Sequence, residues 1–248
     1  GDVSDLEAVR QMVAAAGALP LRGVMHSAGV TDDAAVASLE WDRIERVMRA
    51  KVAGSWNLHL ATRELQLDHF VLFSSGAAFL GSPGQANHAM ANNFMGALAQ
   101  HRRAAGLPAL SIDWGPWAEV GAATRDGVLE RARSAGLNPI EVEPGLEMLG
   151  RLMADEDVSA RVAAIPVEWP RYLANIPGGA ERGWFDRVRG EGSASPLTSA
   201  AGESVAVEAP KVDEAFLATA LLGSVAGRRG EVALDGVRSI ASRVLGAG

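Results

Sequence analysis

Four polar side chains in the segment Val71–Phe94 are spaced so that they could act together. Ser74 and Ser75 follow a short apolar run, while His88 and Asn92 lie four residues apart in a later stretch. Because residues at this spacing share one face of a helix, the imidazole and the amide would project from the same side. Hydroxyl, imidazole and amide groups form hydrogen bonds, and an imidazole can also transfer a proton. The spacing therefore predicts a polar site at which these groups converge.

The elements around these residues explain how they would meet. The apolar run Phe70–Phe73 ends in small polar residues, which predicts a buried strand. Turn-forming residues follow at positions 81–84, and the stretch after them predicts a helix that runs to Arg103. In α/β proteins, ligands bind outside the carboxyl ends of the strands. The end of this strand at Ser75 is therefore the expected place for a site.

A lysine lies on a helix face that should pack inward. Ser38 is expected to cap a long helix over residues 39–66, whose apolar seam runs through Ile44 and Val47 and then meets Lys51. A lysine at such a position either extends its ammonium to the rim of the core or points it into a site. The helical pattern alone leaves both interpretations open.

The remaining pattern predicts an α/β fold. Helices are expected from a Ser4 cap with Glu7 to about Ala16, over residues 126–135 and over residues 143–154. The other predicted strands are Leu21–Met25, Leu107–Asp113 and Val162–Val167. Strands that alternate with helices indicate a parallel sheet covered on both faces. Only about four strands are visible and a Gly-rich strand-to-helix turn is absent. We therefore expect part of a Rossmann-like, doubly wound parallel sheet whose first half lies upstream.

Composition narrows the class of protein. The 248 residues are 48% apolar, carry a net charge of −7 and include no cysteine. The sequence therefore has no disulfide framework, and we expect neither nucleic acid nor a membrane as a partner. The chain shows no secretory leader and no initiator Met, so we expect a piece of a longer cytoplasmic polypeptide. Residues 189–212 are rich in Gly, Ser, Ala and Pro and predict a flexible linker, and residues 213–248 are expected to be helical.

Several residues have a plain interpretation beside a functional one. Taken alone, Ser75 could cap a strand end and Asn92 could be a surface amide. His26 and Trp114 either contact a cofactor or pack the rim of the sheet. Six charged residues are expected on solvated surfaces, namely Asp32, Glu40, Arg43, Arg46, Arg102 and Arg103.

Six ordered blocks of the sequence resemble the ketoreductase domain of modular polyketide synthases, a branch of the short-chain dehydrogenase/reductases. The blocks are Gly1–Asp5, Gly23–Gly29, Arg49–Val52, Phe70–Ser75, Gly81–Asn87 and Asp113–Trp117. The resemblance covers about residues 1–188, which would form the carboxyl-terminal part of the catalytic domain. Residues 213–248 resemble the lead-in and first helix of an acyl carrier domain.

The resemblance assigns roles residue by residue. It implies that Lys51, Ser75 and Asn92 are catalytic and that NADPH is the cofactor. In this family the lysine also holds the cofactor ribose, the serine helps to polarise the carbonyl and the asparagine supports a water relay. The implied cofactor-binding positions, besides Lys51, are Asp2, Val3, Ser27, Ala28, Gly29, Gly115, Pro116 and Trp117.

One catalytic residue of the family is replaced. The family has Tyr four residues before the asparagine, and this chain has His88 there, while its one tyrosine is Tyr172. An imidazolium with a reference pKa of about 6.5 could donate a proton, but burial and a neighbouring lysine ammonium both disfavour that charged form. We therefore expect impaired reduction.

Stereochemical markers of the family are also present. Asp33, Pro83 and Asn87 match the B-type, which gives the D-configured hydroxyl, and Leu80 stands where the opposite type has Trp. Met90, where the epimerising subtype has Pro, argues against that subtype. Loss of the tyrosine, in contrast, resembles the redox-silent C-type domains.

The resemblance therefore implies reduction of a β-ketoacyl thioester carried on the phosphopantetheine arm of an acyl carrier domain. The partners would be that carrier domain and the other domains of the same synthase. Two alternatives stay open. One is a redox-silent domain that scaffolds the module, and the other is an epimerase.

Overall fold

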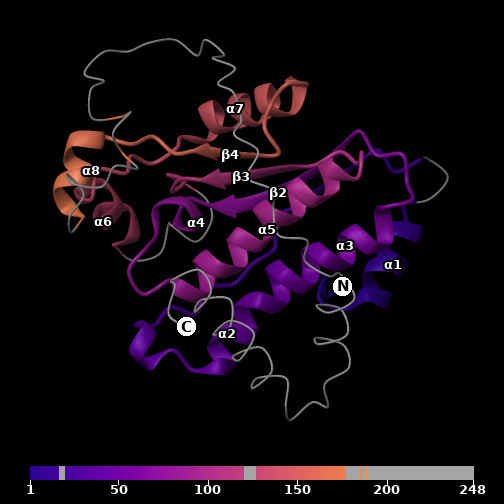
Figure 1. Ribbon diagram of the computed structural model, residues 1–248, viewed down its shortest axis with the longest axis horizontal. Helices are drawn as coiled ribbons and strands as arrows, with labels where there is room; N and C mark the ends of the chain where they lie inside the picture. The colour runs from indigo at the N-terminus through magenta and orange to yellow at the C-terminus, as the bar shows by residue number, and fades with distance from the viewer. Residues whose placement is uncertain (17–19, 120–126, 177–184, 186–187, 189–248) are drawn as a thin grey trace, which may run out of the picture. The chain divides into compact units, whose positions relative to one another are not determined.

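The structure is a computed structural model that describes residues 1–16, 20–119, 127–176, 185 and 188. Its centre is a parallel sheet of four strands in the order β1 (Gly23–His26), β2 (His69–Ser75), β3 (Leu110–Trp114) and β4 (Arg161–Ala164), shown in Figure 1. The predicted parallel α/β arrangement is therefore confirmed, with each strand within a few residues of its expected place.

The start of β3 shows why strand boundaries shift from the apolar pattern. The run from Leu107 was expected to be strand, yet pairing begins at Leu110. The Leu107 N–H donates to the carbonyl of Arg102 at 2.9 Å, which closes the end of the preceding helix. Pro108 has no N–H to give to a ladder. The first residues of the run therefore complete a helix end before the chain enters the sheet.

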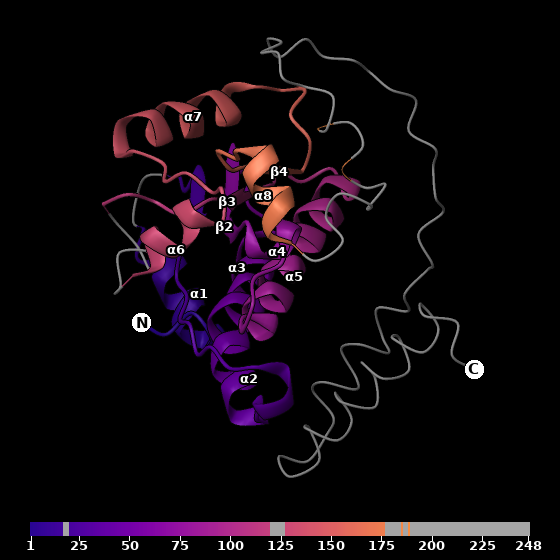
Figure 2. The same cartoon turned by 90° about the vertical axis from the view of Figure 1, so that its left-hand side faces the viewer.

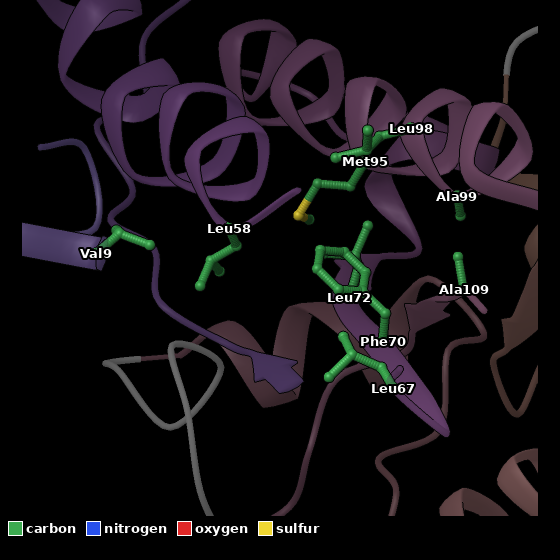
Figure 3. Close-up of a cluster of buried hydrophobic side chains, with 9 residues drawn as sticks. All are labelled: Val9, Leu58, Leu67, Phe70, Leu72, Met95, Leu98, Ala99 and Ala109. Atoms are coloured by element: carbon green, nitrogen blue, oxygen red, sulfur yellow. The ribbon is translucent and has the colours of Figure 1, made fainter. Parts of the chain in front are cut away.

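Helices cover both faces of the sheet. Figure 2 shows α7 (Val142–Ala154) on one side and α3 (Gly54–Thr62) with α5 (Ala86–Ala104) on the other. Side chains along β2 point alternately to the two faces of the sheet, so the strand contributes to the core on both sides. Phe70 and Leu72 face α5, and Val71 faces the α7 side. On the α5 side, Figure 3 shows the buried cluster that holds the layers together. It consists of Val9, Leu58, Leu67, Phe70, Leu72, Met95, Leu98, Ala99 and Ala109.

The long helix predicted over residues 39–66 is a run of three segments instead. It comprises α2 (Trp41–Met48), a π-helical turn (Arg49–Ala53) and α3. The expected Ser38 cap is wrong, because Glu40 occupies the cap position and the Ser38 hydroxyl donates to the Ala35 carbonyl within a short 3-10 turn (Val36–Ser38). Single π-helical turns often occur at functional sites.

The cap of the first helix is also corrected. Helix α1 spans Leu6–Ala14, and its cap is Asp5, whose carboxylate accepts from the N–H groups of Glu7 and Ala8. Ser4 was expected in this role, but its own N–H and hydroxyl both donate to Asp2. The Asp5 carboxylate, one residue closer to the helix than Ser4, therefore accepts the hydrogen bonds of the first free N–H groups of α1.

Two further helices match prediction and two were missed. The expected helices over 126–135 and 143–154 correspond to α6 (Val128–Ser134) and α7. Neither α4 (Ala77–Leu80) nor α8 (Trp169–Asn175) was predicted from the sequence. Within the described ranges, no helix has the length and apolarity needed to cross a bilayer. The predicted linker and tail, residues 189–248, lie outside the described residues.

Candidate active site

The end of β2 places its two serines in different environments. The Ser74 hydroxyl is buried and donates to the carbonyl of Asn92 at 3.3 Å, which ties the strand to α5. Ser75 is half-buried, and its hydroxyl accepts from the Ala77 N–H at 3.2 Å. Neighbouring side chains on a strand point to opposite faces. Ser74 therefore anchors α5, and Ser75 remains nearer the surface at the strand end.

Lys51 points into the site and does not reach the rim. Its side chain is buried, and Nζ donates to the carbonyl of Phe73 in β2 at 3.0 Å. A Cβ on Gly29 would lie 2.9 Å from the Lys51 Cε, so the glycine is what lets the loop after β1 lie against the lysine. Burial lowers the pKa of the Lys51 ammonium to about 8.

His88 and Asn92 lie one turn apart on α5, as predicted. The Asn92 amide is fully buried and donates to the His88 carbonyl at 2.7 Å. Burial and, to a smaller extent, the charge of Lys51 lower the pKa of His88 to about 4, against an opposing effect of Asp33. The His88 imidazole is therefore neutral at pH 7. Its Nδ1 and the Asn92 Oδ1 are buried and have no partner in the described part of the chain.

His26 brings a second buried imidazole to the site. It ends β1, is buried, and its pKa is lowered to about 4, first by burial and then by the charge of Lys51. One ammonium therefore acts on two buried imidazoles that come from different elements. The geometry agrees for two of these groups, because His26 pairs with Leu72 of β2 and Lys51 donates to the carbonyl of the next residue, Phe73.

The predicted amino-terminal cofactor positions line the β1 side. A hollow of about 350 Å³ is bordered by Val3, Ser27 and Ala28, together with His26. The Val3 carbonyl accepts from Asn57 at 3.0 Å, which fixes this segment on α3. Asp2 lies outside the hollow, and its hydrogen bonds from Ser4 lower the pKa of its carboxyl.

The predicted positions after β3 are held in place by packing. The Gly115 N–H donates to the Ala164 carbonyl at 2.9 Å, and the Pro116 carbonyl accepts from Ile140 at 2.7 Å. The Trp117 ring packs on the α7 side, where a Cβ on Gly145 would lie 2.5 Å from it. Trp117 is thus part of the core beneath α7, while Gly115 and Pro116 follow the strand end.

A polar network that joins the loop carrying Asp32 to α2 and α5 was not predicted from the sequence. Asp32 was expected in solvent, and this expectation is wrong, because its carboxylate is largely covered and pairs with Arg43 at 2.8 Å and with Arg46. The side chains of Arg43 and Arg46 remain solvated, as expected, whereas Arg102, which was also expected in solvent, is fully buried. The fully buried Asn87 donates to the carbonyl of Asp32 at 2.9 Å and accepts from the His88 N–H at 2.9 Å. Network partners from distant segments leave no local periodicity in the sequence.

Two other features bear on the chemistry. The one tyrosine of the sequence, Tyr172, is buried in α8 and its hydroxyl donates to the Leu80 carbonyl at 3.3 Å, so it is not the family's catalytic tyrosine in another place. Within the described residues, no group of three His, Cys, Asp or Glu side chains could hold a metal ion. The polar groups at the site that are available to a ligand include the Lys51 ammonium, the His26 and His88 imidazoles and the Asn92 amide oxygen.

The parallel α/β fold is that of the Rossmann-like domains of ketoreductases. Residues 1–119 match the family model described as "KR domain". The described part of the chain superposes on A-type ketoreductases from a modular polyketide synthase with a TM-score of 0.66 and 41% identity, covering 71% of this chain and 38% of that one. Residues 1–119 are therefore similar to a ketoreductase (KR) domain, and the chain as a whole is similar to ketoreductases of modular polyketide synthases.

Curated relatives agree with this placement. The chain is 46% identical over 160 residues to the phenolphthiocerol synthesis polyketide synthase type I Pks15/1 of Mycobacterium marinum. That match covers 62% of this chain and 8% of the relative, so the chain spans only a small part of the length of that relative. A small-chain dehydrogenase in complex with NADPH shares the fold, with a TM-score of 0.56 and 16% identity over 66% of this chain and 80% of that one.

Proposed function

We propose that residues 1–188 form the carboxyl-terminal part of a domain that reduces a β-ketoacyl thioester, carried on an acyl carrier domain, to the β-hydroxyacyl thioester with NADPH. The observation that carries this proposal is the meeting of Lys51, His88 and Asn92 beside the end of β2, where Ser75 lies. These four groups come from three elements and occupy the strand end at which α/β proteins bind ligands. We assign the catalytic positions of the family to these four residues.

The polar groups of the site fit a ligand that carries hydroxyl groups. The Lys51 ammonium has three N–H donors, and one of them donates to the Phe73 carbonyl. Lys51 would therefore hold the ribose, and Asn92 would support a water. The nicotinamide ribose would be bordered by Ser27, Ala28 and Gly29. Val3 and Asp2 would lie at the adenine, and Gly115, Pro116 and Trp117 beside the nicotinamide. When bound, NADPH supplies the hydride.

The step for which this site is least suited is delivery of the proton to the new hydroxyl. Ser75 would donate a hydrogen bond to the substrate carbonyl, and His88 would stand where the family's tyrosine delivers a proton. A neutral imidazole with a pKa near 4 for its protonated form still donates a hydrogen bond, but it is a far weaker acid than an imidazolium. Loss of a positioned general acid typically slows a reaction by about 10²–10⁴-fold. We therefore propose slow reduction.

The same observation supports a second candidate function, a redox-silent domain that scaffolds its module and leaves the ketone intact. Burial and the Lys51 charge both keep His88 neutral, so the site retains its architecture while lacking a strong acid. An epimerase that exchanges the α-hydrogen without consuming NADPH is the third and weakest candidate, because Met90 stands where that subtype has Pro.

The stereochemical proposal rests on the loop network. Asp33 accepts from the Gln85 amide at 2.9 Å, and Asn87 donates to the carbonyl of Asp32 at 2.9 Å. Two of the B-type positions, Asp33 and Asn87, therefore belong to one connected arrangement at the start of α5. If reduction occurs, we propose the D-configured hydroxyl as the product.

We also propose the rest of the domain organisation. Residues 189–212 would link the catalytic part to residues 213–248, the start of an acyl carrier domain. The upstream half of the domain would precede Gly1, and the partners would be that carrier domain and the other domains of the same synthase.

The deciding experiment follows NADPH oxidation with a β-keto thioester, using the complete domain with its upstream half and a His88→Tyr variant in parallel. Comparable turnover by both proteins makes His88 a working donor. Turnover by the tyrosine variant alone means a silenced reductase with an intact cofactor site. If neither protein reduces the substrate, the enzyme proposal is rejected in favour of the scaffold. Retention of the α-deuterium of a labelled substrate excludes the epimerase.

A further inference from the structure

The side-chain amide of Asn93 joins the two helices that flank the site. Its Nδ2 donates to the Ala78 carbonyl at 3.0 Å and to the Ala89 carbonyl at 3.1 Å. Ala78 lies in α4, which follows Ser75 closely, and Ala89 follows His88 in α5. Figure 2 shows α4 lying beside α5. One amide therefore bridges the segments that carry two of the proposed catalytic groups.

Helix α4 is in turn tied to the Ser75 hydroxyl. The N–H of Ala77, the first residue of α4, donates to the Ser75 Oγ at 3.2 Å. The next amides close the turn, since Phe79 and Leu80 donate to the Gly76 carbonyl at 3.0 and 2.8 Å. Because α4 is a single short turn, a shift of its peptides also moves the donor that orients the Ser75 hydroxyl.

The amide of Asn93 is anchored from the sheet. Arg161 in β4 donates through Nη1 to the Asn93 Oδ1 at 2.9 Å and through Nε to the Asp113 carboxylate at 2.7 Å. Asp113 is buried in β3, so the anchor begins inside the sheet. The arginine crosses α5 at Gly96, where a Cβ would lie 2.7 Å from the Arg161 Cδ.

This anchor also fixes the orientation of the amide. A guanidinium only donates hydrogen bonds, so the Asn93 oxygen must face Arg161 and its NH₂ must face the two carbonyls. The network therefore runs in one direction, from the Asp113 carboxylate through Arg161 and Asn93 to the peptides beside Ser75 and His88.

We propose that Asn93, anchored by Arg161 and Asp113, is a positioning residue that sets the placement of the Ser75 hydroxyl relative to His88 and Asn92. This inference deepens the proposed function and rests on it for the meaning of the site, although the geometry can be tested independently. A merely structural tie would stabilise α5 without affecting the turn that carries Ser75.

The test compares Asn93→Leu, which removes the amide at nearly constant size, with Gln100→Leu, a matched change two turns along the same exposed face of α5. Both are made in the complete domain carrying His88→Tyr, and Arg161→Met is the third variant. Amide hydrogen exchange reports on α4, and steady-state kinetics with NADPH and a β-keto thioester report on catalysis.

We expect the Ala77–Gly81 amides to exchange about tenfold faster in Asn93→Leu, as the loss of one or two hydrogen bonds predicts. Arg161→Met should reproduce the effect, and Gln100→Leu should not. We also expect kcat to fall by about tenfold, because the reacting groups would be less well oriented. The KM for NADPH should be unchanged.

Unchanged exchange in Asn93→Leu, or equal acceleration in Gln100→Leu, would overturn the inference. Accelerated exchange with an unchanged kcat would also overturn it, because Asn93 would then be a structural tie only. If none of the variants reduces the substrate, the proposed function fails, and the exchange at α4 still decides whether Asn93 places Ser75.

Discussion

The Lys51 Nζ donates to the carbonyl of Phe73 at 3.0 Å, and this bond holds an ammonium inside the fold beside the end of β2. The location has two electrostatic consequences. Burial lowers the pKa of Lys51 to about 8, and the charge that remains helps to lower the pKa of both His26 and His88 to about 4. Near neutral pH the site therefore combines a charged lysine with two neutral imidazoles.

Replacing Lys51 with Met should raise the pKa of both histidines. The substitution keeps an unbranched side chain and removes the charge that opposes protonation of His26 and His88. Burial, the larger cause of both shifts, remains, so each pKa should rise and stay below 6.5. NMR titration of the imidazole resonances in the complete domain measures the change. Unchanged values for both histidines would show that Lys51 does not act on them.

Stability should fall as the pH drops below about 6.5. His26 and His88 have a pKa of about 4 in the folded protein, whereas an unfolded histidine titrates near 6.5. Between these values the unfolded chain binds more protons, so acid favours unfolding. Each unit of difference corresponds to about 1.4 kcal/mol. Urea unfolding of the complete domain at pH 5 and pH 7.5 should show a lower free energy of unfolding at pH 5.

Variants of the two histidines provide the control for this pH dependence. His26→Asn and His88→Gln each remove one of the titrating groups, so each should reduce the difference between the two pH values. His69→Gln is the matched control, since His69 is a histidine at the opposite end of β2. A pH dependence that is the same in all three variants would refute the assignment to the buried imidazoles.

The sequence allowed prediction of the elements whose residues carry a local pattern. The apolar run at Phe70 predicted β2, and the four-residue spacing of His88 and Asn92 placed both on α5. The inward position of Lys51 was also predicted, although the pattern left its direction open until the bond to Phe73 decided it. Period and spacing are set within one element, which is why these predictions held.

The missed features depend on contacts between distant segments. The ion pairs of Asp32 join a loop to α2, and Asn87 connects that loop to α5 across many residues. The π-helical turn at Lys51 could not be predicted, because a turn with one extra residue has the same kind of sequence as an ordinary α-helical turn. The prediction of Ser4 as the cap of α1 was wrong for a related reason. Ser4 and Asp5 are both favourable cap residues, but the Ser4 hydroxyl donates to Asp2, so Asp5 caps the helix.

A Cβ on Gly29 should weaken the cofactor site while leaving the fold intact. In Gly29→Ala the new methyl group would lie 2.9 Å from the Lys51 Cε, so the lysine side chain must shift. Because this contact is with the far end of a flexible side chain, the free energy of unfolding should change little. We expect the Kd for NADPH to rise about tenfold or more, because the shifted Lys51 would lose one charge-assisted hydrogen bond to the ribose. Fluorescence titration with NADPH measures it, and an unchanged Kd would contradict the proposed ribose contact of Lys51.

Asn87 should be among the more costly polar residues to replace. Its buried amide donates to the carbonyls of Asp32 and Arg43 and accepts from the His88 N–H. Truncation in Asn87→Ala leaves these groups without their partner, which typically costs about 1–3 kcal/mol for a buried polar group. Urea unfolding of the complete domain measures the loss, with Gln66→Ala as a control at an exposed amide.

Asn87→Asp separates the two halves of this network. The carboxylate keeps the acceptor for the His88 N–H but cannot donate to the two carbonyls, so a loss close to that of Asn87→Ala would assign the stability to the loop contacts. A much smaller loss would assign it to the bond at His88 instead. If Asn87→Ala is no more destabilising than Gln66→Ala, the loop carrying Asp32 is not held by this amide.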